Sequence, residues 1–132
     1  MSFLIDTDIC SAYLKHDPTV VSRVMLHFGG LEVSAITVGE LMTWTMRLKA
    51  PPARRQGVYD LLRAAAVLDV TLPVAEKFGE LRAALMDQGR RVDEMDLLIA
   101  ATALVHNVPL VTHNVQDFCN IPGLTVVDWL KP

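Results

Sequence analysis

The 132-residue sequence has only two cysteines, Cys10 and Cys119, and they lie far apart. Two isolated cysteines cannot build a disulfide framework, and they lack the paired spacing of a zinc site, so we expect free thiols in a reducing compartment. No apolar run reaches the roughly 18 residues of a membrane helix. The amino terminus also lacks a basic segment followed by a long apolar stretch. We therefore expect a soluble, cytoplasmic protein without a membrane segment.

Other chemistries are excluded by missing motifs. The sequence has no glycine-rich phosphate loop, which argues against use of ATP or GTP. It has no glycine-serine-glycine elbow and no helical pair of zinc-binding histidines. A net charge of −3 gives no general attraction to nucleic acid, so a polyanionic partner would need local basic patches or bound cations. Candidate patches, each of which could equally be an ordinary solvated face, are Arg47 with Lys49, Arg54 with Arg55, and Arg90 with Arg91.

The residues that are present predict one compact α/β domain over residues 1–132. Hydrophobic residues make up 52% of the chain, enough for a core of ordinary size. Short apolar runs alternate with helical segments of about three turns, which indicates βαβ units and a mainly parallel sheet in a three-layer α/β/α sandwich. The predicted strands are 2–5, 31–35, 67–71, 109–112 and an edge strand at 124–127. The predicted helices are a short one after the first strand, then 18–28, 37–49, 53–66, 74–88 and 93–106.

Several acids lie at the boundaries of these elements, and each has an ordinary explanation as a helix cap. Asp93 can accept a bond from an amide of the first helical turn, and Asp96 can reach back as an aspartate variant of the capping box. Thr37 and Glu40 have the spacing of a capping box as written. Asp8 fits a cap of the first short helix slightly better than a supporting role in a binding site.

The same acids also permit a metal site. Asp6, Glu40 and Asp96 each adjoin apolar sequence that we expect to be buried, and Asp117 follows the fourth predicted strand. In parallel sheets, ligands bind at the carboxyl ends of the strands. Carboxylates that converge without matching cations must be protonated or hold a metal, and an all-oxygen set favours Mg²⁺ or Mn²⁺ over zinc.

Four segments in order carry a resemblance to a known family. They are LIDTDI at 4–9, VSAITVGEL at 33–41, DLLIAATAL at 96–104 and LVTHNVQDFCNIPGLTVVDW at 110–129. The sequence resembles the PIN-domain ribonucleases, specifically the VapC-type toxins of bacterial toxin–antitoxin pairs. The resemblance spans nearly the whole chain and is weakest between about residues 50 and 72.

The resemblance implies a function and a set of site residues. It implies a PIN-like fold and a Mg²⁺- or Mn²⁺-dependent endoribonuclease that leaves a 5′-phosphate and a 3′-hydroxyl. It also implies a homodimer and a VapB-type antitoxin that lays its carboxyl-terminal segment across the acidic groove. The acids of the family's metal cluster fall on Asp6, Glu40 and Asp96. Its fourth acidic position falls in a segment that contains Thr112, Asn114 and Asp117, and the amide at Asn114 leaves open whether Asn114 or Asp117 faces the metal.

Two other functions remain compatible with these residues. The first is a PIN-like module that binds RNA or protein but has a weakened site, because Asn114 binds a cation less strongly than an aspartate would. The second is a phosphoacceptor receiver domain, which also gathers acids at strand ends. A receiver needs a reactive aspartate on a central strand, and the second and fourth predicted strands end without one.

A pair of substitutions separates the two roles assigned to neighbouring acids. We expect Asp93→Asn to lower the free energy of unfolding modestly, by less than about 1 kcal/mol, and to leave metal-dependent RNA cleavage largely intact. Asp96→Asn should have the reverse effect. Chemical denaturation and an RNA cleavage assay on both variants measure the contrast, and equal loss of cleavage in the two variants would contradict it.

Overall fold

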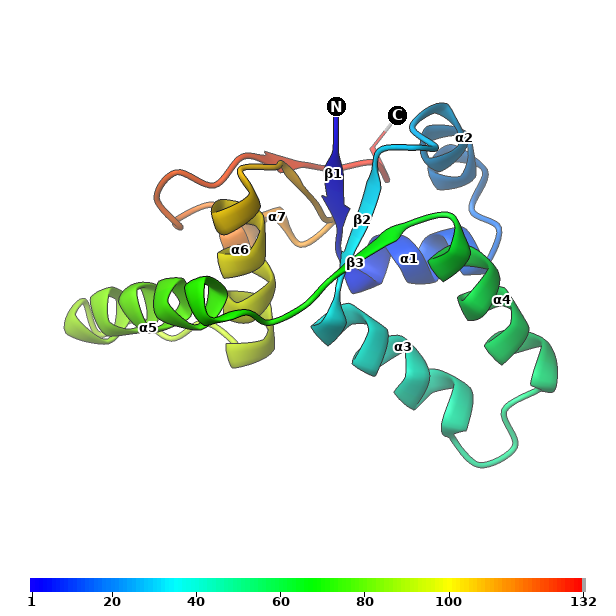
Figure 1. Ribbon diagram of the computed structural model, residues 1–132, viewed down its shortest axis with the longest axis horizontal. Helices are drawn as coiled ribbons and strands as arrows, with labels where there is room; N and C mark the ends of the chain where they lie inside the picture. The colour runs from blue at the N-terminus through cyan, green and yellow to red at the C-terminus, as the bar shows by residue number, and fades with distance from the viewer. Residues whose placement is uncertain (132) are drawn as a thin grey trace.

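The central sheet fixes the arrangement of all other elements. The structure, a computed structural model, describes residues 1–131 (Figure 1). Its five strands are all parallel and lie in the order β3-β2-β1-β4-β5, so the first strand is central. The strands are β1 (Phe3–Ile5), β2 (Leu31–Ser34), β3 (Ala66–Leu68), β4 (Leu110–Val111) and β5 (Val126–Val127). The predicted parallel sheet and the edge position of the last strand are confirmed.

Side chains of β1 alternate between two hydrophobic cores. Phe3 and Ile5 face one core, and Leu4 faces the other. Because successive side chains of a strand point to opposite faces, one short apolar run serves both layers. Helices α1 (Thr7–Leu14), α2 (Pro18–Leu26) and α4 (Pro52–Arg63) cover the first face, to the right of β1 in Figure 1. Helices α5 (Leu72–Asp87) and α6 (Glu94–His106) cover the second face, to its left. The three-layer α/β/α sandwich is therefore confirmed.

Seven helices complete the described part of the chain. They are α1 (Thr7–Leu14), α2 (Pro18–Leu26), α3 (Ala35–Met46), α4 (Pro52–Arg63), α5 (Leu72–Asp87), α6 (Glu94–His106) and α7 (Val115–Phe118). Several boundaries follow the local signals in the sequence. Asp17 caps α2, Asp93 caps α6, and Gly89 takes a left-handed conformation just after α5.

Two of the predicted caps are wrong. Ser34 caps α3 and accepts a bond from the Ile36 N–H, so Thr37 lies inside the helix and forms no capping box with Glu40. Asp6 caps α1, and Asp8 is in the first turn of that helix. In both cases the helix begins directly after the strand. Ser34 is the last residue of β2 and Asp6 follows β1, and each has a side-chain oxygen that accepts from an N–H of the first helical turn.

The other differences concern element ends. Strand β3 is shorter than predicted and ends at Leu68, because 69–71 lead into α5 with Thr71 as its cap. The one-turn helix α7 was not predicted. Trp44, Phe78 and Leu81 pack in the cores, whereas Met46 is exposed.

Both cysteines are free, Cys10 in the core and Cys119 at the surface, as predicted. Among residues 1–131, no helix combines the length and the apolar character that crossing a membrane requires.

The cap at Ser34 gives a stability test. Ser34 is fully buried, and its hydroxyl oxygen is 3.1 Å from the Ile36 amide nitrogen. We expect Ser34→Ala to lower the free energy of unfolding by about 1 kcal/mol, because a helix amide loses its partner. Thr43→Ala, on the exposed side of the same helix, should change it by less than about 0.5 kcal/mol. Urea denaturation of both variants checks the difference, and equal effects would contradict the cap assignment.

Candidate active site

The carboxyl ends of β1 and β4 bring the first acid into a buried position. Asp6 follows β1 directly, and its amide donates to the Val111 carbonyl of β4 at 2.9 Å. Its side chain is 4% exposed. Asp6 Oδ1 accepts from the Thr7 N–H at 2.8 Å, and Oδ2 accepts from the Thr112 hydroxyl at 2.9 Å. The first acid is therefore fixed by two donors, one in the first residue of α1 and one in the residue that follows β4.

Asp8 lies beside Asp6 and is held by the loop after β4. Its Oδ2 accepts from the His113 N–H at 3.0 Å, and the Thr112 hydroxyl is 3.4 Å away. Its Oδ1 is buried and has no hydrogen-bond partner within the described part of the chain. A buried carboxylate oxygen without a donor is costly, so this atom requires a proton, a water or a cation.

Glu40 joins the site through a residue that the sequence analysis did not single out. The Thr7 hydroxyl donates to Glu40 Oε1 at 2.6 Å and lies 3.2 Å from the Thr37 hydroxyl. Thr7 thus connects Asp6, through its amide, to Glu40, through its side chain. The Asp-Thr-Asp sequence after the first strand contains this residue, but the pairing depends on how α1 and α3 pack.

Asp96 lies in the first turn of α6 and is half-buried. Asp93 caps this helix, because its Oδ1 accepts from the Met95 and Asp96 amides at 2.9 and 3.2 Å. The cap assigned to Asp93 from the sequence is confirmed. No hydrogen bond from the described residues engages the Asp96 carboxylate, so its side chain does not form the second half of a capping box.

The pKa values of the acids record their proximity. Burial raises the pKa of Asp6 to about 7, and the negative charge of the neighbouring Asp8 adds to the rise. The hydrogen bonds from Thr112 and Thr7 oppose it. Burial also raises the pKa of Asp8. The pKa of Asp96 rises to about 6, first through burial and then through the charges of Asp93, Asp117, Glu40 and Asp8. The acids therefore form one electrostatic cluster.

The fourth acidic position can be compared with its amide neighbour. Asp117 is exposed in α7, and its charge acts on Asp96. Asn114 is the cap residue of α7, and its backbone N–H donates to the Thr112 hydroxyl oxygen at 3.1 Å. The Asn114 N–H also lowers the pKa of Asp8. Asp117 is thus placed to act on Asp96 through its charge, whereas Asn114 acts through its backbone.

The donor set fits a hard divalent cation. Within residues 1–131, no lysine, arginine or histidine forms an ion pair with any of the clustered acids Asp6, Asp8, Glu40, Asp96 and Asp117. In the same residues, no group of three or more histidine, cysteine, aspartate or glutamate side chains lies close enough together to hold a metal ion by itself. Mg²⁺ needs only one or two direct carboxylates and keeps several waters, so acids spaced around shared waters suit it. The unpaired Asp8 oxygen points to the same need for positive charge.

The fold and this acidic edge agree with a comparison against known families. Residues 3–124 match the PIN domain, so the chain belongs to the PIN-domain family. Within that family, the chain is similar to proteins named as VapC ribonucleases. The chain is 31% identical to the tRNA(fMet)-specific endonuclease VapC of Shigella flexneri, over 98% of each chain. It is 30% identical to ribonuclease VapC2 of Haemophilus influenzae, over 98% of this chain and 99% of that one.

Solved structures give the same relationship. The DNA-bound VapBC complex of Salmonella typhimurium contains a chain with a TM-score of 0.92 and 30% identity, over 98% of both chains. The VapBC2 complex of Rickettsia felis, bound to a promoter fragment, contains one with a TM-score of 0.90 and 26% identity, over 98% of this chain and 99% of that one. The resemblance to VapC-type PIN domains is confirmed.

The raised pKa of Asp6 predicts how stability depends on pH without metal. Between pH 3.8 and about 7, the folded protein keeps a proton that the unfolded chain has lost. This contribution to stability is complete below the lower value and is lost as the pH rises toward the upper one. Asp6→Asn should therefore raise the melting temperature, relative to the unmodified protein, more at a pH of about 8 than at about 4.

Thermal unfolding in the presence of a chelator measures this effect. Asp69→Asn, at an exposed acid after β3, is the matched control and should give the same small difference at both pH values. A pH-independent difference for Asp6→Asn would contradict the assignment.

Proposed function

We propose that this protein is a Mg²⁺- or Mn²⁺-dependent endoribonuclease and the toxin of a VapBC-type toxin–antitoxin pair. The observation that carries the proposal is the convergence of five carboxylates at the carboxyl edge of the sheet without a protein cation among the described residues. The relatives named as ribonucleases support a nuclease of the VapC type. We further propose that the chain acts as a single domain in the cytoplasm.

The acids take different positions in the proposed metal site. Asp6, Glu40, Asp96 and Asp117 would hold the ion, and Asp8, Thr112 and Asn114 would support them. When bound, the ion neutralises charge that develops on the phosphate and lowers the pKa of a bound water.

The residues of the chain prepare this site before substrate binds. Thr112 and Thr7 keep the Asp6 carboxylate in one orientation. Asp6 is buried and Asp96 half-buried, whereas Glu40 and Asp117 lie at the exposed rim. This gradient lets RNA approach from the rim while the innermost acid stays shielded from bulk water. Hydrolysis would leave a 5′-phosphate and a 3′-hydroxyl.

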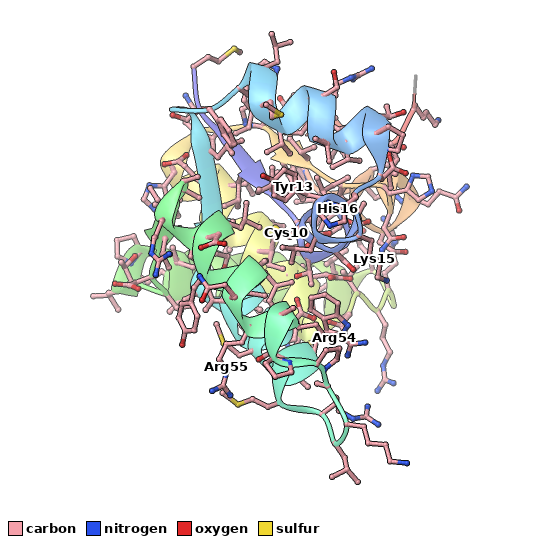
Figure 2. All side chains as sticks on the ribbon, turned by 90° about the vertical axis from the view of Figure 1, so that its right-hand side faces the viewer. Cys10, Tyr13, Lys15, His16, Arg54 and Arg55 are labelled. Carbon is pink, nitrogen blue, oxygen red and sulfur yellow. The ribbon has the colours of Figure 1, made fainter. Side chains whose placement is uncertain are left out.

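A partner surface lies next to the acids along α1. One cleft of about 580 Å³ runs from Asp8 past Ser11 and Ala12 to Lys15 and His16. It adjoins a groove of about 540 Å³ between α1, α2 and α4, lined partly by Tyr13 and Phe28. Figure 2 shows Tyr13 on α1 and Lys15 and His16 directly after it, with Arg54 of α4 nearby. We propose that the carboxyl-terminal segment of a VapB-type antitoxin occupies this surface.

The solved VapBC complexes of the relatives support a toxin–antitoxin assembly. We also propose that the protein forms a homodimer. Exposed apolar side chains support a further buried contact, and they include Met46, Leu48 and Leu72.

A second candidate function is a binding module with little catalytic power. Asn114 favours it, because an amide binds a cation less strongly than an aspartate would. The charge of Asp117, which acts on Asp96, favours the enzyme instead, because it adds a further carboxylate to the acidic cluster.

Cleavage of RNA by purified protein, free of antitoxin, tests the enzyme. A mixed RNA pool should be cut with Mn²⁺ and remain intact without it. Asp6→Asn and Asp96→Asn should each lose about 100-fold or more, because charge stabilisation by a bound ion amounts to several kcal/mol. Asp117→Asn should lose more activity than Asn114→Ala. Undiminished cleavage by both Asp6→Asn and Asp96→Asn would refute the site.

Metal binding has an independent readout in the same proteins. An excess of Mn²⁺ at about 100 times its dissociation constant should stabilise the unmodified protein by about 2.7 kcal/mol. Asp6→Asn should lose most of this gain, whereas Asp69→Asn should keep it. RNA binding without any cleavage by the unmodified protein would favour the binding module.

A further inference from the structure

A second charged cavity lies on the other side of the acidic cluster, between α5 and α6. Its volume is about 440 Å³, within the range of cavities that hold small ligands. The end of α5, the loop that follows it and the first turn of α6 form its walls. It is lined by Arg82, Leu85, Met86, Arg90, Arg91, Val92, Asp93, Glu94 and Leu97.

Two of its three arginines are available to a ligand. Arg82 pairs with Glu94 at 2.9 Å. Arg90 and Arg91 are exposed, and within residues 1–131 neither forms an ion pair. The Asp93 carboxylate that also lines the cavity is occupied by two amides of α6. The cavity therefore presents two free guanidinium groups, which suit the oxygens of a phosphate.

The cavity lies within one helical turn of Asp96, a member of the acidic cluster. Asp93 lines it, and the charge of Asp93 contributes to the raised pKa of Asp96. The two residues lie within one turn of α6, a rise of about 4.5 Å along the helix axis. A strand of RNA that placed a phosphate at Asp96 would thus have its neighbouring nucleotide at the mouth of the cavity.

Charge explains why such a cavity is needed. The chain carries a net charge of −3, and the acidic cluster itself repels a polyanion. Binding of RNA then depends on local cations beside the site. Apolar side chains next to these cations, Met86 and Val92, give a surface against which a ribose or an unstacked base can pack.

We propose that this cavity is the subsite for the nucleotide that flanks the scissile phosphodiester, with Arg90 and Arg91 on its phosphate. The inference rests on the proposed ribonuclease function and adds the residues that hold the substrate beside the acidic cluster. A cavity of this size can accept one nucleotide whose base is splayed out of a stack.

The test measures RNA binding in catalytically inactive protein. Asp96→Asn protein is titrated with a labelled single-stranded RNA oligonucleotide in the presence of Mg²⁺. Adding Arg90→Gln and Arg91→Gln together should raise the dissociation constant for this RNA about 10-fold, because charge-assisted bonds to phosphate are lost. The dependence of log affinity on log salt should become shallower by roughly 0.7 to 1.4.

Two further variants control for the loss of a surface charge and for bidentate geometry. Arg55→Gln removes one charge from an exposed arginine that points to the opposite side of α4 from Lys15 (Figure 2). It should leave RNA affinity within about twofold. Arg90→Lys with Arg91→Lys keeps both charges but loses the bidentate fork, so its affinity should lie between those of the unmodified pair and the double glutamine variant. Unchanged melting temperatures for these surface variants show that the fold is intact.

The outcomes separate this inference from the proposed function. With the native Asp96, the double glutamine variant should raise KM about 10-fold and keep kcat within about threefold at saturating RNA. The subsite is overturned if the double glutamine variant binds RNA as tightly as Arg55→Gln does. It is also overturned if the Asp96→Asn protein does not bind RNA. Loss of affinity for an acidic peptide with RNA affinity intact would make the cavity a protein-docking site and also overturn it. Failure of the unmodified protein to cleave RNA overturns the enzyme alone, because the subsite is measured by binding.

Discussion

The structure depends on one constraint, the burial of the Asp6 carboxyl group at the end of the central strand. Strands lie on both sides of β1, so its end opens into the middle of the sheet edge. Moving a carboxylate out of water costs several kcal/mol unless donors or a cation compensate. Two donors from the protein, the Thr7 amide and the Thr112 hydroxyl, compensate in part. The pKa of about 7 shows that desolvation and neighbouring charge still exceed their effect.

The remaining acids surround this buried group in order of exposure. Asp8 and Asp96 are half-buried and Glu40 and Asp117 are exposed, so the negative potential is largest where water is scarcest. Positive side chains that form no ion pair within residues 1–131 lie outside the cluster, at Arg90 and Arg91 on the α5–α6 loop and at Lys15 directly after α1. An anion is thus attracted to the flanks, and a cation is attracted to the centre. This separation of charge suits a site that binds both a metal ion and a phosphate chain.

Sequence reasoning succeeded where the signal was local. Asp17 before a proline, Asp93 before an apolar helix and Gly89 after one each define a boundary through contacts within a single turn. It failed at α3, because Ser34 and Thr37 both have cap chemistry and only the end of β2 decides between them. The bridge from Thr7 to Glu40 could not be predicted, since it joins residues 33 positions apart. The acids of the candidate site were all named in advance, but their spacing required the fold.

The contact between Thr112 and Asp6 spans 106 residues of sequence. During synthesis, β1 leaves the ribosome before β4 has been made, because more than 100 residues of the chain separate them. The buried carboxyl group cannot obtain its hydroxyl donor until residue 112 is available, and contacts of such high sequence separation form late in folding. A partly made chain therefore has the acids without the edge that orients them. If the protein has the proposed nuclease activity, this order of synthesis delays the completed site, on a ribosome surrounded by RNA, until β4 and Thr112 have been made.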